Sequence, residues 1–82
     1  MAKLLFFGSL PDKLGLGSQD IPLPFTVKDV RGLLEWLRRR GRNWELFLAE
    51  DRVQVTVNKH FAELETKVND EDEIAIISIG LR

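Results

Sequence analysis

Residues 73–82 read EIAIISIGLR, and this stretch decides how the rest of the chain must fold. Between residues 74 and 79, five side chains are apolar and four of them are isoleucine. This density of β-branched residues is typical of a strand that is buried along most of its length. We therefore expect residues 74–79 to form a central strand, which would deliver the residues after it to a fixed place.

A second run that is apolar on both strand faces lies near the start of the chain, at residues 3–7 (KLLFF). Side chains alternate across a strand, so Leu4 and Phe6 point to one face. Leu5 and Phe7 then point to the other face. This run is expected to form another central strand.

The connection after this first strand is rich in turn formers. Residues 11–18 (PDKLGLGS) predict a loop. Residues 19–24 can form a strand only at a sheet edge, because Pro22 has no N–H to donate to a neighbour. The two strands would then make a hairpin with a long connection.

One strong amphipathic helix is predicted at residues 27–40. Thr26 and Asp29 match the capping pattern in which a hydroxyl residue is followed by an acid, and Gly41 is a C-terminal stop signal. The arginines at 38–40 suit the negative end of the helix dipole better than an anion site. The apolar stripe has helical spacing and consists of Val27, Val30, Leu33, Leu34 and Leu37.

The second half of the chain predicts mainly strands. Residues 42–51 can form one or two helical turns, whose aromatic side chains we place at the core edge. Residues 52–57 alternate apolar and polar, as in a strand covered on one face. Residues 58–59 suit a tight turn into a short strand at 60–62. Residues 66–73 form a polar connection to the last strand.

These elements predict an α+β fold: a β-grasp, ubiquitin-like mixed sheet packed on one main helix. The first and last strands would lie side by side in parallel. One helix leaves the other sheet face open, so Leu5 and Phe7 or their strand neighbours, together with either Ile76 or Ile77, should point outward. Large apolar groups on an open face are a candidate partner surface. The predicted partner-binding residues are Leu5, Phe7, Phe61, Ile77 and Ile79.

Length and composition limit the possible functions. The 82 residues predict one domain spanning 1–82. A net charge of −1 gives no electrostatic reason to expect nucleic acid or an anionic membrane as a partner. Without cysteine there are no disulfides or thiol nucleophiles. The apolar run at 4–7 is too short for a signal peptide or membrane span. We expect a cytoplasmic protein.

No self-contained active site is visible, so we expect neither an enzyme nor a bound cofactor or metal. His60 is the only histidine and has no orienting acid nearby in sequence, which favours a surface residue beside a turn over a general base. The acidic run at 70–73 lacks the ligand spacing of a calcium loop. A solvated loop that could attract a basic partner is the preferred interpretation.

Several segments together resemble the MoaD family, the small ubiquitin-like subunits of molybdopterin synthase, and the related thiamine-pathway sulfur carriers that share their fold. The similar segments follow the family order over nearly the whole chain. They are KLLFFG at 3–8, DKLG at 12–15, Thr26-Val27 before a leucine-rich helix with Trp36-Leu37, VTVN at 55–58 and DEDEIA at 70–75.

The resemblance implies a carrier that acts as a cosubstrate. An adenylating, ubiquitin-activating-type enzyme would activate its C-terminal carboxylate, which becomes a thiocarboxylate and gives sulfur to a pterin precursor in the large synthase subunit. Family members end in Gly-Gly, since residues without Cβ can thread a narrow channel. Here Gly80 is the acyl candidate, but Leu81 and Arg82 follow it. The proline usual before the tail is also absent, and Glu71 replaces a turn glycine.

Three interpretations of this ending remain. A protease could remove Leu81 and Arg82 and expose Gly80, or the tail could be charged poorly as it stands. Alternatively, the chain could keep the fold and partner face without the chemistry. The sequence therefore predicts a sulfur-carrier-like protein of molybdenum-cofactor biosynthesis, with a ubiquitin-like protein-interaction module as the alternative.

Overall fold

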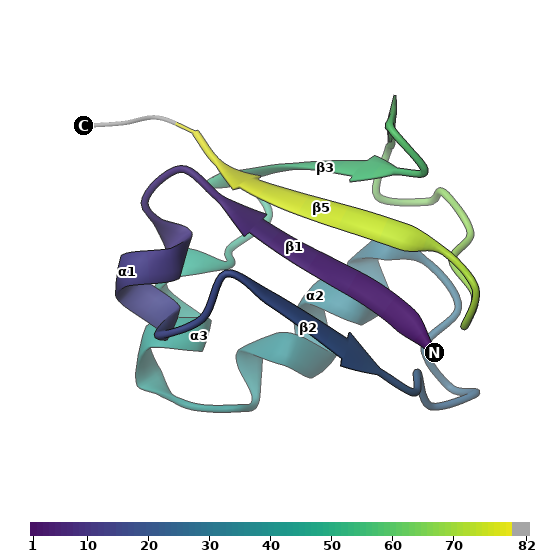
Figure 1. Cartoon of the computed structure of the whole chain (residues 1–82), viewed down its shortest axis with the longest axis horizontal. Helices are drawn as coiled ribbons and strands as arrows, with labels where there is room; N and C mark the ends of the chain where they lie inside the picture. The colour runs from purple at the N-terminus through teal and green to yellow at the C-terminus, as the bar shows by residue number, and fades with distance from the viewer. Residues whose placement is uncertain (80–82) are drawn as a thin grey trace.

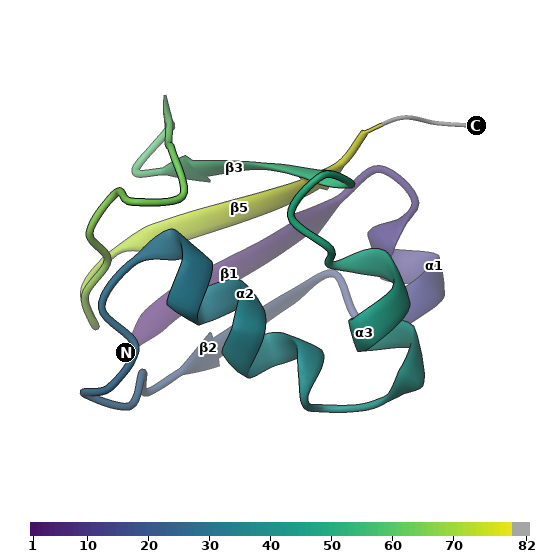
Figure 2. The ribbon, with the colours of Figure 1, turned by 180° about the vertical axis from the view of Figure 1, so that it is seen from behind.

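The structure is a computed structural model that describes residues 1–79. Within this range five strands form one mixed sheet in the order β2-β1-β5-β3-β4, and the helices lie on one side of it (Figure 1, Figure 2). The predicted β-grasp architecture is confirmed. In chain order, the elements are β1 (Ala2–Phe7), α1 (Leu10–Leu14), β2 (Ser18–Ile21), α2 (Val30–Arg38), α3 (Arg42–Phe47), β3 (Val53–Val57), β4 (His60–Phe61) and β5 (Glu73–Ser78).

The first and last strands lie side by side in parallel at the centre of the sheet, as predicted. Their register runs from Lys3 opposite Glu73 to Phe7 opposite Ile77. β2 flanks β1 and β3 flanks β5, both antiparallel, and β4 extends the sheet beyond β3. Both central strands therefore have a hydrogen-bonded neighbour on each side.

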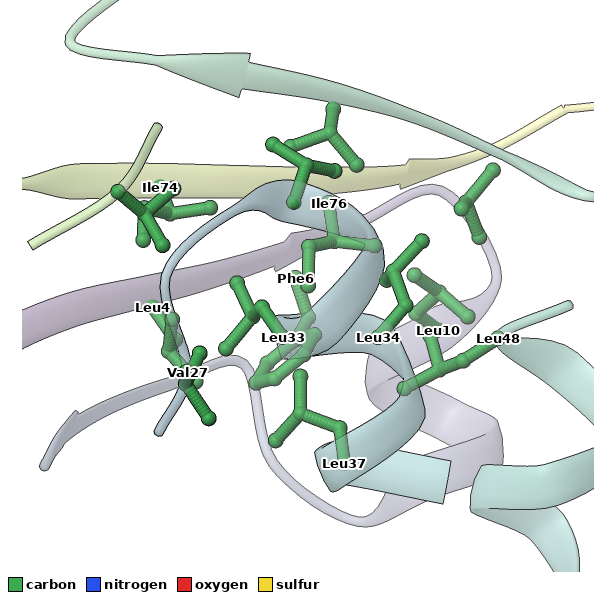
Figure 3. Close-up of a cluster of buried hydrophobic side chains, with 14 of the residues drawn as sticks. Leu4, Phe6, Leu10, Val27, Leu33, Leu34, Leu37, Leu48, Ile74 and Ile76 are labelled. Carbon is green, nitrogen blue, oxygen red and sulfur yellow. The ribbon is translucent and has the colours of Figure 1, made fainter. Parts of the chain in front are cut away.

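The core lies between the sheet and the helices (Figure 3). Leu4 and Phe6 of β1 and Ile74 and Ile76 of β5 are at most 2% exposed and point toward the helices. The sequence did not decide whether Ile76 or Ile77 points outward. Because Ile76 is buried, Ile77 is the residue that points outward. The helices and the segment after α3 supply the fully buried partners Leu10, Val30, Leu33, Leu34, Leu37 and Leu48.

The prediction of a helix at 27–40 capped by Thr26 is wrong at both ends. Asp29 is the N-cap, and its carboxylate accepts a hydrogen bond from the Gly32 N–H at 2.8 Å. Asp29 itself has an extended backbone and forms an isolated β-bridge with Lys67. Helix propensity assigned residues 27–29 to the first helical turn, but this tertiary pairing keeps them outside the helix.

Three other boundaries differ from the prediction. The expected loop at 11–18 contains α1, which has Pro11 in its first turn and ends at Gly15 in the left-handed conformation. Gly41 does not stop α2, which ends earlier, but precedes α3 in extended backbone. The edge strand is shorter than expected and ends at Ile21, before Pro22, whose nitrogen would face the free edge in this register.

The turn between β3 and β4 is confirmed at Asn58 and Lys59. Both have positive φ, at 52° and 72°, as a tight turn between right-twisted strands requires. The short helix within 42–51 is also confirmed as α3. Among residues 1–79, no helix is long and apolar enough to cross a membrane.

Candidate functional site: the open sheet face and the end of β5

The face of the sheet that faces the viewer in Figure 1 carries no helix. On it, Leu5 of β1 stands opposite Ala75 of β5, and Phe7 stands opposite Ile77. Residues opposite one another in a ladder project to the same side, so these four side chains form one apolar strip across the central strands. The sequence predicted the outward direction of Leu5 and Phe7 correctly.

The strip continues onto the neighbouring strands. Thr56 of β3 stands opposite Ala75, and Phe61 of β4 stands opposite Thr56, which brings Phe61 to the same face. Ile79 follows Ile77 at the spacing that keeps a side chain on one face. We call Leu5, Phe7, Phe61, Ile77 and Ile79 the open-face cluster; they are the predicted partner-binding residues, and the structure places all five on one side of the sheet.

Several side chains of the open-face cluster are more exposed than large apolar groups usually are. Phe7 is 47% exposed, Ile79 is 49% exposed and Phe61 is 80% exposed. Leu5 and Ile77 lie half-buried between them. Grouped apolar side chains of this size on a surface favour contact with another molecule, because water would be released from all of them together.

On the two central strands, the charged residues of this face lie at the opposite end. Lys3 stands opposite Glu73 on one side and opposite Asp20 on the other. The apolar part therefore occupies the end at which the parallel strands β1 and β5 both finish (Figure 1). A molecule bound there would also meet the chain as it leaves β5.

The end of β5 is held from two sides. The Ser78 hydroxyl oxygen accepts a hydrogen bond from the Ser9 N–H at 2.9 Å and lies 3.2 Å from the Ser9 hydroxyl. On the other side, the Ile79 N–H donates to the Arg52 carbonyl at 2.9 Å. Gly80, the predicted acyl residue, lies outside the described residues. The segment that leads to it starts from a fixed point.

The contact between Ser78 and the β1–α1 turn was missed in the sequence. Gly8 has a φ of 72°, and a Cβ at this position would overlap the Ser78 hydroxyl. A glycine directly after a strand was the available signal, since such a residue often permits a left-handed turn or a close approach of two chains. Its partner, more than sixty positions away, was not visible.

The other candidate residues have structural roles. His60 is exposed beside its turn, with Nδ1 3.2 Å from the Asn58 carbonyl. Asp72 accepts hydrogen bonds from the Asn58 side chain and from the Asn69 N–H, both at 2.9 Å. Within residues 1–79, no group of three or more acidic, histidine or cysteine side chains is placed to hold a metal ion.

Asp70 also serves the loop that precedes β5. Its carboxylate accepts a hydrogen bond from the Leu23 N–H at 2.8 Å and lies 3.4 Å from the N-terminal ammonium group. The bond from Leu23 is the main reason why the pKa of Asp70 is lower than its ordinary value. The acidic run is thus partly an internal network that ties two loops together.

The arginines at the end of α2 pack against their surroundings. Arg38 donates to the Leu48 carbonyl at 2.9 Å. The Arg40 guanidinium lies 4.9 Å from the ring centroid of Trp44 and 5.4 Å from that of Trp36, and partial burial lowers its pKa. These contacts give the arginines a structural role beyond the helix dipole.

Comparison with known families adds to this geometry. A ThiS family profile matches residues 4–80. The chain belongs to the ThiS family. Members of this MoaD/ThiS-like family are small sulfur-carrier subunits and not catalysts themselves. No curated protein matches this ThiS-family chain significantly.

Solved structures show the same fold. A Pyrococcus furiosus protein assigned as molybdopterin converting factor, subunit 1, has a TM-score of 0.75 at 23% identity over 94% of both chains. SAMP1 from Haloferax volcanii has a TM-score of 0.75 at 18% identity over 96% of this chain and 94% of its own. A second H. volcanii structure, small archaeal modifier protein 1, gives 0.65 at 20% identity over 94% of each chain. The MoaD-like resemblance is confirmed at this level.

Proposed function

We propose that this ThiS-family chain is a sulfur-carrier protein that docks on its partner proteins through the open-face cluster. One observation carries the proposal: the apolar strip runs along the parallel strands to Ile79, directly before the candidate acyl residue Gly80. A partner that covers the cluster would therefore also receive the segment on which carrier chemistry takes place.

In this proposal the chain's own residues bind and position, and the partner enzyme does the chemistry. Phe7 and Ile77 would supply most of the desolvated contact at the centre, and Phe61 would extend it to the sheet edge. Ser78, which is held by its hydrogen bond from Ser9, would fix the direction in which the following residues leave the sheet. With Leu81 and Arg82 removed, the Gly80 carboxylate would attack ATP, release pyrophosphate and form an acyl adenylate, from which a sulfur donor displaces AMP.

Molybdenum-cofactor biosynthesis is the proposed pathway. The resemblance to MoaD and the assignment of the P. furiosus neighbour support it. The partners would then be the large subunit of molybdopterin synthase and an adenylating activating enzyme, both acting in the cytoplasm. Neither nucleic acid nor a membrane is needed for this function.

A protein-interaction module without acyl chemistry is the second candidate. It is favoured by the sequence after β5, in which Gly80 is followed by Leu81 and Arg82 and no Gly-Gly pair occurs. Both candidates use the open-face cluster, so only the chemistry at Gly80 distinguishes them.

Intact-mass measurement after incubation with an activating enzyme, ATP and a sulfur source tests the choice. We expect a variant ending at Gly80 to gain the mass difference between sulfur and oxygen. The 82-residue chain should gain it only after cleavage behind Gly80. A Gly80→Ala version of the shortened chain is the matched control. If an enzyme that is active on its own carrier charges none of these chains, the carrier proposal is wrong and the interaction module remains.

A further inference from the structure

The edge of β3 is left partly open by the rest of the chain. In an antiparallel ladder, the backbone groups of successive residues face opposite neighbours. The Arg52 carbonyl accepts the Ile79 N–H and so faces β5. By this alternation, the N–H and carbonyl groups of Val53 and Val55 face away from β5, toward the side on which β4 adds to the sheet.

β4 and the residues after it cover only part of this edge. The Ala62 N–H donates to the Val55 carbonyl at 3.0 Å, and the chain then turns toward α2, where the Leu64 carbonyl accepts the Arg31 N–H at 3.0 Å (Figure 2). Within residues 1–79, the Val53 N–H, the Val53 carbonyl and the Val55 N–H have no hydrogen-bond partner. Such groups are suited to pair with an added strand.

A pocket of about 150 Å³ lies beside this open edge, between β3, α2 and residues 62–64. A protein cavity of this size accommodates a group about as large as benzene, which is the scale of one side chain. Most of its lining residues are apolar, but polar atoms supply much of the exposed wall, and two of the lining residues carry carboxylates. The lining residues are Val30, Leu34, Glu50, Val53, Gln54, Val55, Ala62, Glu63 and Leu64.

The charges at the pocket favour a cation. Glu63 forms no ion pair within residues 1–79. Glu50 lies 3.5 Å from the Arg31 guanidinium, which is shared with Glu65 at 3.2 Å. One arginine is therefore shared by two carboxylates, and Glu63 has no cationic partner among the described residues. Apolar lining residues together with carboxylates fit a lysine or arginine side chain, whose methylene stem is apolar and whose end is charged.

We propose that this β3-edge pocket binds a short extended peptide of a partner protein, which pairs with the free backbone groups of Val53, beyond the point where Ala62 leaves β3, and inserts a lysine or arginine side chain toward Glu50 and Glu63. In strand addition, backbone hydrogen bonds supply affinity and a side-chain pocket supplies specificity. The site uses neither the open-face cluster nor Gly80, so it does not depend on the proposed sulfur-carrier function.

Titration of the isotope-labelled chain with the capped peptide acetyl-Thr-Val-Lys-Val-Thr-amide tests the proposal by NMR. We expect saturable amide shifts centred on Val53, Val55 and Leu64. A peptide with glutamate in place of lysine should not bind. Methylation of a peptide nitrogen that faces β3 should abolish binding, whereas methylation of the next nitrogen, which faces solvent, should not.

Variants of the chain test the two carboxylates. We expect Glu63→Gln and Glu50→Gln each to raise the dissociation constant of the lysine peptide roughly two- to five-fold, the range for a partly exposed charge pair. Glu71→Gln, which removes a carboxylate outside the pocket, is the control and should have no effect. Absence of saturable shifts, shifts centred on the open-face cluster, or equal binding by the glutamate peptide would each overturn the proposal.

Discussion

Gly8→Ala should destabilise the fold through a specific contact with Ser78. The φ of Gly8 is 72°, a left-handed conformation that costs about 1–2 kcal/mol for a residue with a Cβ. The new methyl group would also displace the Ser78 hydroxyl, which accepts the Ser9 N–H at 2.9 Å. Losing that hydrogen bond costs about 0.5–1.5 kcal/mol. We therefore expect the free energy of unfolding to fall by about 1.5–3.5 kcal/mol.

A double-mutant cycle with Ser78→Ala isolates the contact. Alone, Ser78→Ala should cost only the hydrogen bond. In the Gly8→Ala background that bond is already lost, so Ser78→Ala should cost almost nothing further. The two effects should fail to add by about 1 kcal/mol, as for residues in direct contact.

Gly15→Ala provides the matched control. Gly15 is also left-handed, with a φ of 84°, but a Cβ there has no atom within 4 Å. Gly15→Ala should lower the free energy of unfolding only through its strained backbone conformation. Its effect should be additive with that of Ser78→Ala. Urea unfolding followed by fluorescence of the two tryptophans measures all these values. Equal costs for Gly8→Ala and Gly15→Ala, or full additivity at Gly8 and Ser78, would refute the reasoning.

Three further variants test other parts of the structure. Phe7→Ala should change stability little but abolish partner binding, whereas Phe6→Ala, which empties a site only 2% exposed, should cost about 3–5 kcal/mol in urea unfolding; equal costs would place Phe7 in the core. The lowered pKa of Asp70 means that its stabilising effect is present above its ordinary pKa of 3.8 and is lost as the pH falls through the lower folded value. Asp70→Asn should therefore reduce the acid dependence of stability, and an unchanged pH profile would show that the bond from Leu23 contributes nothing. Arg40→Met should lower the free energy of unfolding by about 0.5–1 kcal/mol and alter tryptophan fluorescence, because it removes a cation from two aromatic faces; unchanged fluorescence would contradict that packing.

Patterns of apolar residues were sufficient to predict most of the sheet. The doubly apolar runs in β1 and β5 required two central strands, and the alternation in β3 required a strand covered on one face. Helix boundaries were harder to predict, because Asp29 forms a β-bridge with Lys67, which is distant in the sequence. Local propensity contains no information about such a tertiary partner. The signals for α1, proline at its start and glycine at its end, were present but also fit a loop.

The open-face cluster could be predicted from the sequence for the same reason as the sheet. Once Leu4 and Phe6 are buried, alternation sends Leu5 and Phe7 outward. Neither the close approach of Gly8 to Ser78 nor the open edge of β3 could be predicted. The first depends on two distant turns meeting in space, and the second depends on where the chain leaves β3 after Ala62.

The parallel pairing of β1 with β5 has a consequence for synthesis. The open-face cluster draws on both the first and the last strands described, so neither half of the chain contains it alone. While residues 73–79 are still in the ribosome, Leu5 and Phe7 have β2 on one side but lack β5 on the other, and contacts so distant in sequence form late in folding. A partner that recognises this surface would therefore select chains whose synthesis has passed β5, and ignore truncated ones.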